Sequence, residues 1–461
     1  MTQKFLQLVR KEEDSALPLR GLSIAISPSL QNFLNVENEL TLSLGQKIIT
    51  VPIYIHSFNK QDIIFSKELQ NEILLPDHVD TFLLPYPISN NILTLGPVIG
   101  ILTEINEKQN EISIPSIHHF CEELDDELKK MGGFYYVCGL PNLQEDCVNG
   151  YLFHQQKWIQ TLLPYPHVFY NRLHSRQIDA SNAFLEWKKE FEARNIPLFN
   201  SKFFSKMEIH QLLNEHTPFH SHLPKTTALT ELSLDEMLHL YSDLYLKPIS
   251  GSQGRGIIHL QAIHDKYYTT ISSGKKKGNK KEFNSKKKLW KWLQNYMKKK
   301  PYLCQQGIAF QPWNERTLDF RILCHKNIDH NWEITSVVGR VAQEDTFVAN
   351  LAQGAVMKPA KQILDDLFDV KEASTKLNLM KKLTIEIAEF LSYHTNGLLG
   401  ELGIDIGIDK NGDIWIIEVN SKPSKKLDEH VGKTRPSTKA LLEYFIALSF
   451  SPFIKERKED A

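Results

Sequence analysis

The chain has 461 residues, of which 41% are hydrophobic and 24% are charged, so a single small module and wholesale disorder are both excluded. Lysine and arginine number 54 and aspartate and glutamate 55. The resulting formal charge of -1 excludes a global field that would hold nucleic acid or an anionic membrane.

The five cysteines are scattered and show no zinc-like spacing, which favours a reduced, cytoplasmic compartment. The first residues lack the apolar core and small-residue cleavage site of a signal peptide. The most apolar stretch, residues 440–454, is too short to span a bilayer, and we interpret it as a buried C-terminal helix. No membrane partner is therefore expected.

The N-terminal part predicts two domains. Short β-rich runs such as Lys47–Ile55, broken by Asn, Asp, Gly and Pro, predict a small β-rich domain over residues 1–95. Strand-like and helical runs then alternate, which predicts an α/β domain with a largely parallel sheet over residues 96–200. The predicted strands and helices of that domain cover residues 96–103, 120–131, 133–138, 166–172 and 180–194.

Residues 244–260 read as a strand, a glycine-rich loop and a second strand. Gly251, Gly254 and Gly256 allow close backbone approach, and Lys247 adds a fixed positive charge, so the loop suits a phosphate chain. The β-branched residues that follow exclude a P-loop or a Rossmann fingerprint. A flap over a nucleotide and a purely structural turn both stay open.

Lysines crowd together between residues 275 and 300. A solvated loop that leads into a helix near Leu289 explains this run best. Binding of an acidic polymer or surface is the alternative.

Residues 317–323 and 332–342 predict adjacent strands that carry Arg321 and Arg340. Guanidinium groups match phosphate or carboxylate oxygens with two hydrogen bonds, although each arginine alone is more often a surface charge. A helix that follows at 374–393 has an apolar face at helical spacing and is predicted to be structural.

A hairpin near the C-terminus gives the strongest signal. Residues 401–409 and 413–420 flank an Asn-Gly dipeptide at 411–412, which is typical of a two-residue type I′ turn. If that turn forms, counting outward from it places Asp405 directly opposite Glu418.

Alternation along the two strands places Asp405, Glu418 and Asn420 on one face. The other face then carries Ile404, Ile406, Ile417 and Val419. Directly opposed like charges are destabilising, and a hard divalent cation such as Mg²⁺ is the economical way to offset them. A shared proton or plain solvent exposure is the competing explanation.

The order of these motifs resembles the ATP-grasp superfamily and, more closely, the YheC/YheD group of endospore-coat-associated proteins. The resemblance rests on the amino-acid sequence of residues 246–257, 319–321, 403–409 and 418–424. It implies a multidomain α+β / α/β fold: an ATP-grasp domain over residues 201–455, with a glycine-rich flap subdomain at about 245–305. An α/β pre-ATP-grasp-like domain and the small β-rich domain would precede it.

The resemblance also implies roles for individual residues. Those implied to bind ATP are Lys206, Lys247, Gly251, Ser252, Gly254, Arg255, Gly256, Gln305, Gln306, Gly307 and Ile308. Those implied to act in catalysis are Arg321 and Arg340, facing the γ-phosphate or an acyl phosphate, and Asn350 in the acceptor loop. Those implied to hold Mg²⁺, with Mn²⁺ as a substitute, are Asp405, Glu418 and Asn420.

The function that follows from the resemblance is an ATP-dependent ligase that activates a carboxylate as an acyl phosphate for attack by an amine or a thiol. The alternative is a nucleotide-binding structural protein of the spore coat without turnover. A protein kinase is disfavoured, because no His-Arg-Asp catalytic loop with a downstream Asn is present. Expected partners are ATP, a carboxylate and amine substrate and spore coat components, with no nucleic acid.

Overall fold

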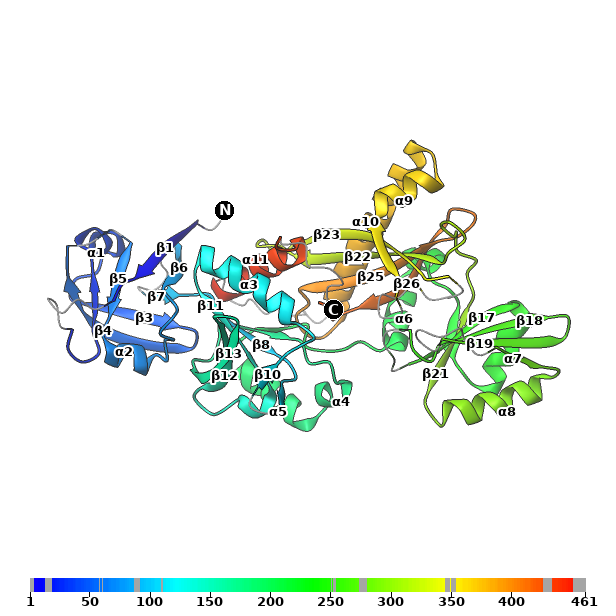
Figure 1. Cartoon of the computed structure of the whole chain (residues 1–461), viewed down its shortest axis with the longest axis horizontal. Helices are drawn as coiled ribbons and strands as arrows, with labels where there is room; N and C mark the ends of the chain where they lie inside the picture. Colours follow the sequence, from blue (N-terminus) through cyan, green and yellow to red (C-terminus); the bar gives the residue numbers. More distant parts are fainter. Residues whose placement is uncertain are drawn as a thin grey trace.

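The computed structural model describes residues 4–12, 19–57, 59, 61–86, 92–108, 111–249, 251, 254–272, 280–344, 349, 354–425 and 433–450. Figure 1 shows an elongated molecule in which a β-rich N-terminal unit, a second unit and two further sheets follow one another along the long axis. Four large sheets and the small β9–β10 ladder make up the described β structure.

The N-terminal unit is built on a sheet of strand order β6-β1-β5-β2-β4-β3-β7. Its elements are β1 (Lys4–Arg10), β2 (Ile24–Ile26), α1 (Pro28–Leu34), β3 (Glu39–Leu44), β4 (Lys47–Ile55), β5 (Asp62–Phe65), α2 (Lys67–Glu72), β6 (Thr81–Tyr86) and β7 (Ile92–Leu95). The predicted β-rich character is present, but two short helices were not predicted. Each begins after a serine, Ser27 or Ser66, whose hydroxyl accepts a hydrogen bond from the first turn.

The second unit has the strand order β13-β12-β11-β8-β14-β15. Its elements are β8 (Val98–Leu102), β9 (Asn106–Lys108), β10 (Glu111–Ser113), α3 (His118–Met131), β11 (Phe134–Cys138), η1 (Leu140–Asn142), β12 (Val148–His154), β13 (Lys157–Leu163), β14 (Val168–Asn171), α4 (Arg176–Asp179), α5 (Asn182–Ala193) and β15 (Leu198–Phe199). The central pairs β11–β8, β8–β14 and β14–β15 are parallel, and β12 and β13 add an antiparallel edge.

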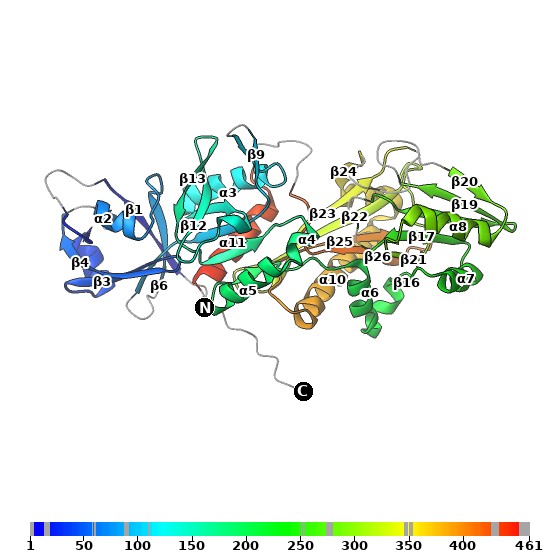
Figure 2. The ribbon, with the colours of Figure 1, turned by 90° about the horizontal axis from the view of Figure 1, so that it is seen from below.

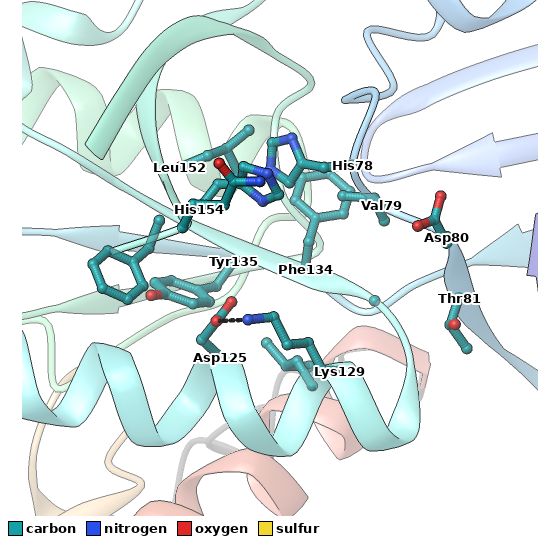
Figure 3. A pocket seen from close by; sticks show the side chains of 14 residues that line it. His78, Val79, Asp80, Thr81, Asp125, Lys129, Phe134, Tyr135, Leu152 and His154 are labelled. Atoms are coloured by element: carbon teal, nitrogen blue, oxygen red, sulfur yellow. Dashed lines mark ion pairs between the residues drawn. The ribbon is translucent and has the colours of Figure 1, made fainter. Parts of the chain in front are cut away.

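A pocket of about 390 Å³ lies where these two units meet. In Figure 3, His78 from the loop before β6 lies against His154 at the end of β12, with ring centroids 4.2 Å apart. Asp125 and Lys129 of α3 form an ion pair of 2.5 Å along its floor. The N-terminal unit is therefore packed on the second unit through polar as well as apolar contacts.

The third sheet, order β16-β21-β17-β18-β19-β20, is antiparallel. Ahead of it lie α6 (Lys206–Asn214) and η2 (Thr217–His222). The strands of the sheet are β16 (Thr226–Ala228), β17 (Asp243–Pro248), β18 (Ile258–Ile263), β19 (Lys266–Ile271), β20 (Lys280–Phe283) and β21 (Tyr302–Gln306). The helices α7 (Glu231–Leu240) and α8 (Lys286–Met297) lie between them in the sequence. Helices α7 and α8 pack their apolar side chains on one face. The opposite face is left for the cleft described below.

The fourth sheet has the order β24-β23-β22-β25-β26 and packs against α10 (Figure 2). Its elements are β22 (Leu318–Lys326), β23 (Trp332–Val341), β24 (Val356–Pro359), α9 (Ala360–Leu367), α10 (Val370–His394), β25 (Glu401–Ile408), β26 (Ile414–Asn420) and α11 (Pro436–Phe450). The buried side chains of α11 join the core of the second unit, which links the C-terminal end of the chain back to that unit.

The predicted helical face of residues 374–393 lies inside α10, where Met380, Leu383, Ile387 and Leu391 are buried. Helix α11 is buried as predicted, and residues 451–454 of that prediction lie outside the described residues. Within the described chain, none of the helices is both long and apolar enough to cross a membrane.

Candidate functional site

A row of charged side chains crosses four strands of the fourth sheet. Arg340 on β23 lies opposite Asp319 on β22, and Arg321 on β22 lies opposite Asp405 on β25. Asp405 in turn lies opposite Glu418 on β26. Because opposed residues share one face of a sheet, the row forms a single charged surface.

Asp405 is almost buried, with 4% of its surface exposed. Both nitrogens of the Arg321 fork donate to its two oxygens, with Nη2 2.9 Å from Oδ2. Arg340 Nη2 lies 2.9 Å from the same Oδ2, and Arg340 also binds Asp319 at 2.6 and 2.7 Å. Burial alone would raise the pKa of Asp405, but the two guanidinium groups outweigh it and lower this pKa to about 2. Asp405 is therefore a carboxylate at neutral pH.

The pairing of Asp405 with Glu418 is confirmed, but it arises differently from the prediction. Near the turn, Ile408 pairs with Ile414 rather than with residue 415, and of the Asn-Gly dipeptide only Gly412 has a positive φ, of 86°. The predicted type I′ turn is therefore wrong. A β-bulge at Ile417 shifts the register by one residue and restores the predicted opposition at Asp405.

The bulge also changes which side chain enters the core. Ile416 is 4% exposed and joins the main apolar cluster with Ile404 and Ile406, whereas Ile417 is only half-buried. Alternation predicted Ile417 on the face of Ile404 and Ile406, but Ile416 takes the buried position opposite Ile406, because strict alternation fails where two residues oppose one.

Glu418 is held from the other side by Lys206. Lys206 is the first residue of α6, which begins at Ser205 with a capping box closed by Glu208. The Lys206 Nζ lies 2.5 Å from Glu418 Oε1, and the side chains are 16% and 33% exposed. The repulsion between Asp405 and Glu418 is thus offset by two arginines and a lysine, a solution that the sequence did not reveal.

The third predicted metal ligand, Asn420, tests whether the site suits a cation. Its Nδ2 is buried and has no hydrogen-bond partner in the part of the chain that the structure describes. Since the amide oxygen and nitrogen exchange places by a half-turn, the side chain can present Oδ1 there instead. Oxygens of Glu418, Asn420 and Asp405 then match the few protein ligands that Mg²⁺ takes beside phosphates. No cluster of three His, Cys, Asp or Glu side chains that could hold a metal ion occurs among the described residues, so phosphate oxygens would complete the shell.

Lys247 enters the same region from the third sheet. It is the penultimate residue of β17 and is half-buried, and its Nζ donates to Gln305 Oε1 at 2.5 Å. Burial, aided by the charge of Lys206, lowers the pKa of Lys247 to about 8, while Glu418 and Asp405 oppose this shift. The structure therefore brings the two predicted lysines together with the two predicted carboxylates.

The predicted hinge, residues 305–308, covers the last two residues of β21 and the two residues after it. The side-chain Oε1 of Gln306 accepts from the backbone N–H of Lys225 at 3.2 Å. Gly307 donates its N–H to the carbonyl of Asp243 at 2.8 Å, and a Cβ at Gly307 would stand 2.2 Å from Asp243 Oδ1. The carbonyl of Ile308 accepts from the N–H of Phe310 at 3.0 Å. A glycine at 307 thus allows this segment to pack against β17.

The predicted flap connects β17 and β18. Gly254 and Gly256 have φ of 68° and 73°, in the region that favours glycine. The carbonyl of Gly256 accepts from the Tyr302 hydroxyl at 3.1 Å, which ties the end of the flap to β21. Gly251 is half-buried and Arg255 is exposed. Ser252 in the flap lies outside the described residues.

Asn350, the predicted acceptor-loop residue, also lies outside the described residues. The arginines predicted with it, Arg321 and Arg340, are both in the charged row.

A pocket of about 680 Å³ opens beside the hinge and was not predicted. It is lined by Gln306 and Thr226 of the third sheet, by Met207 and His210 of α6, and by Trp415 of β26. Because both sheets contribute, the pocket is the end of the cleft between them. Burial and the neighbouring lysines lower the pKa of His210, so this ring is neutral at pH 7.

Part of the lining of this pocket could have been predicted from the sequence. Met207 directly follows Lys206, and His210 lies one turn further along α6. Trp415 lies opposite Gly407, which shares the strand face of Asp405. What the sequence could not provide was the approach of Thr226 and Gln306 from the other sheet.

Comparison with known proteins agrees with this arrangement. A family model described as "YheC/D like ATP-grasp" matches residues 195–448. The endospore coat-associated protein YheD of Bacillus subtilis (strain 168) is 26% identical over 408 residues, which covers 87% of this chain and 88% of that protein. The endospore coat-associated protein YheC of the same organism is 26% identical over 281 residues, covering 58% and 74%.

Solved structures with a similar arrangement include D-alanyl-alanine synthetase A from Vibrio cholerae, with a TM-score of 0.45, 11% identity, and coverage of 77% of this chain and 98% of that one. The ATP-grasp ligase PsnB complexed with its minimal precursor has a TM-score of 0.42 and 13% identity, with coverage of 77% and 99%. The family model spans more than half of the chain, and the multidomain fold agrees with it. The chain therefore belongs to the YheC/D-like ATP-grasp family.

Proposed function

We propose that the chain binds ATP with Mg²⁺ between the third and fourth sheets and uses it to join a carboxylate to an amine or a thiol. The observation that supports the proposal is the convergence of four cations on two opposed carboxylates. The cations are Lys206, Lys247, Arg321 and Arg340, and the carboxylates are Asp405 and Glu418.

Lys206 and Lys247 are placed to neutralise the phosphate chain. Lys247 is half-buried, so water screens its charge less than that of an exposed lysine, which strengthens its attraction to a phosphate. Asp405, Glu418 and Asn420 would hold Mg²⁺, which supplies charge neutralisation at the phosphate oxygens when bound.

The arginines would exchange partners when nucleotide binds. Arg340 keeps its two hydrogen bonds to Asp319. Arg321 has its ion pair with Asp405 alone among the described residues, so it can turn towards a phosphate once Asp405 holds the cation. The two arginines would therefore behave differently: Arg321 would change its partner, and Arg340 would keep Asp319.

The reaction then needs positioning and charge neutralisation rather than a protein nucleophile. A carboxylate oxygen of the substrate attacks the γ-phosphorus, the bond to the ADP oxygen breaks, and an acyl phosphate forms. An amine nitrogen or thiol sulfur attacks the acyl carbon, inorganic phosphate leaves, and the nucleophile loses its proton. Arg321 and Arg340 would offset the charge that develops on the transferred phosphoryl group.

Isothermal calorimetry of ATP binding, with and without Mg²⁺, tests the proposal. We expect Glu418→Gln to weaken Mg²⁺-dependent ATP binding by at least about tenfold, because a metal ligand is lost. Asp413→Asn, an exposed acid on the same hairpin, is the matched control and is expected to bind ATP as the unaltered protein does.

Equal ATP affinity in Glu418→Gln and the unaltered protein would contradict the metal assignment. If Mg²⁺-dependent binding is found, release of ADP is then measured with pools of carboxylates and amines. ADP release that stays at background with every pool would leave ATP binding in place and contradict the ligase.

We also propose that the chain associates with the endospore coat. The support is that the two Bacillus subtilis relatives, each 26% identical to this chain, are named as endospore coat-associated proteins. Fractionation of spores from the source organism, with antibody detection of this chain, tests it. Recovery of the chain only outside the coat fraction would contradict the association.

A further inference from the structure

The third sheet carries a concentration of positive charge that the proposed function does not use. Residues 280–300 hold nine lysines and a single acid, Glu282, for a net charge of +8. The whole chain carries -1, so all other residues together carry -9. The charge of this protein is therefore strongly segregated, although its sum is close to zero.

The structure places these lysines on one connected surface. We call it the lysine face: Lys280 and Lys281 of β20, Lys287, Lys288 and Lys291 of α8, and Lys298, Lys299 and Lys300 after α8. All eight are exposed. Lys287, Lys291 and Lys298 are spaced by four and seven residues, so they follow one side of α8.

The two elements of the lysine face are in contact. Lys281 Nζ lies 5.3 Å from the ring centroid of Trp292 on α8, and Phe283 of β20 packs on the same ring at 5.2 Å. Figure 2 shows β20 at the outer edge of the sheet, beyond β19. Helix α8 packs Leu289 and Leu293 on the sheet face opposite to the cleft, so the lysine face looks away from the candidate site.

Seven of these lysines have no ion pair within the part of the chain that the structure describes, and the eighth, Lys281, has only the contact with Trp292. The neighbouring lysines that do have partners use carboxylates: Lys286 binds Asp235, and Lys266 binds Glu282 at 2.6 Å. Protection of an exposed strand edge explains lysines on β20. It does not explain the six lysines on and after α8.

Three features favour an acidic polypeptide over nucleic acid. Residues 280–300 contain no arginine, the side chain that reads phosphate with two parallel hydrogen bonds. Trp292 is already covered by Lys281 and by Tyr296, which stacks on it at 5.5 Å, so its ring is not free for a base. Among the described strands, the outer strand β20 pairs with β19 alone, which leaves a strand edge for an extended chain.

We propose that the lysine face is a docking surface for an extended polypeptide segment rich in aspartate and glutamate. Carboxylates of the segment pair with the lysines of α8 and of residues 298–300, and its backbone lies along the free edge of β20. This binding is independent of the nucleotide cleft.

Fluorescence anisotropy with a labelled oligo-glutamate peptide tests the proposal over a series of salt concentrations. The test variant combines Lys287→Gln, Lys288→Gln, Lys291→Gln and Lys298→Gln. The matched control combines Lys358→Gln, Lys361→Gln, Lys371→Gln and Lys382→Gln, four exposed lysines of β24, α9 and α10 that give the same change in net charge.

We expect the peptide to bind the unaltered protein with an affinity that falls steeply with salt. The test variant should lose at least about tenfold in affinity, since several ion pairs are removed at once, and the control should keep its affinity. Equal melting temperatures of both variants show that they are folded. Failure of the unaltered protein to bind, or equal losses in both variants, overturns the proposal. Tighter binding of a DNA duplex of equal charge assigns the face to nucleic acid and overturns it as well.

Discussion

Strands β22 and β25 carry two acid–base pairs of the same kind. Arg321 lies opposite Asp405, and four residues along, His325 lies opposite Glu401. The second pair is sealed, because neither His325 nor Glu401 has an exposed side chain. The first pair borders Glu418, whose side chain is 33% exposed. The same pairing pattern thus occurs once in a core and once at an open cleft.

The partners of Glu401 show why it differs. Its Oε1 accepts from His325 Nε2 at 3.0 Å and from Lys425, and its Oε2 accepts from the Tyr170 hydroxyl at 2.6 Å, with Arg172 close by. Burial would raise the pKa of Glu401, but Lys425, His325 and Arg172 together hold it far below its usual value. Each oxygen is satisfied by protein, so this carboxylate has no capacity left for a ligand. Charge pairing alone does not identify a site; incomplete satisfaction and exposure do.

Glu401→Gln breaks the sealed cluster, and we expect the largest effect there. It leaves Lys425 and Arg172 buried without their counter-charge, which costs about 3–5 kcal/mol in the free energy of unfolding. Urea denaturation followed by circular dichroism measures it, with Glu389→Gln on the exposed side of α10 as the control. A loss equal to that of the control would show that the cluster does not stabilise the fold.

Asp405→Asn is expected to have an intermediate effect. Arg340 keeps Asp319, and Arg321, whose side chain is 19% exposed, can reach water, so we expect a loss of about 2 kcal/mol in the free energy of unfolding. The same urea experiment measures it. A loss as large as that of Glu401→Gln would mean that the two pairs are energetically alike and would remove the distinction drawn above.

Glu418→Gln should change stability least. The ion pair of Glu418 with Lys206 is partly exposed, so its removal costs less than about 1 kcal/mol. We therefore expect Glu418→Gln to have almost the same free energy of unfolding in urea as the unaltered protein and yet to lose Mg²⁺-dependent ATP binding. Strong destabilisation would instead make Glu418 a structural residue.

The effect of Lys247 is expected on ATP binding rather than on stability, and it appears only as the pH rises. Its pKa is lowered to about 8 by burial, so it is protonated below that pH and loses its charge as the pH rises. We expect ATP affinity to fall by up to about tenfold per pH unit above 8. Calorimetry between about pH 7 and about pH 9.5 measures this fall, and Lys247→Arg should flatten it because arginine stays charged. A flat profile for the unaltered protein would show that the charge of Lys247 does not contribute.

Local patterns predicted the strands and the opposed carboxylates of this site, because alternation and hairpin counting act over a few residues. They failed at Ile417, where a bulge compensates for a longer turn. They also could not predict the two charged clusters. Arg340 on β23 and Asp405 on β25 form an ion pair although β22 lies between their strands. The partners of Glu401 are residues 170, 172, 325 and 425. Contacts of that separation depend on the assembled sheets and leave no local periodicity.

Asn200, between β15 and α6, joins both strands of the candidate site through one buried amide. Its Oδ1 accepts from the N–H of Gly400 at 2.9 Å, and its Nδ2 donates to the carbonyls of Glu401, at 2.9 Å, and Ser421. Together with α11, this fastens the second unit to the fourth sheet. The third sheet is connected to them by two short crossings, near Lys225 and near Gly307. Rotation about these crossings would widen or narrow the cleft while the row of charges kept its shape, so Asp405 and Glu418 would stay in place and Lys247 of β17 would move relative to them.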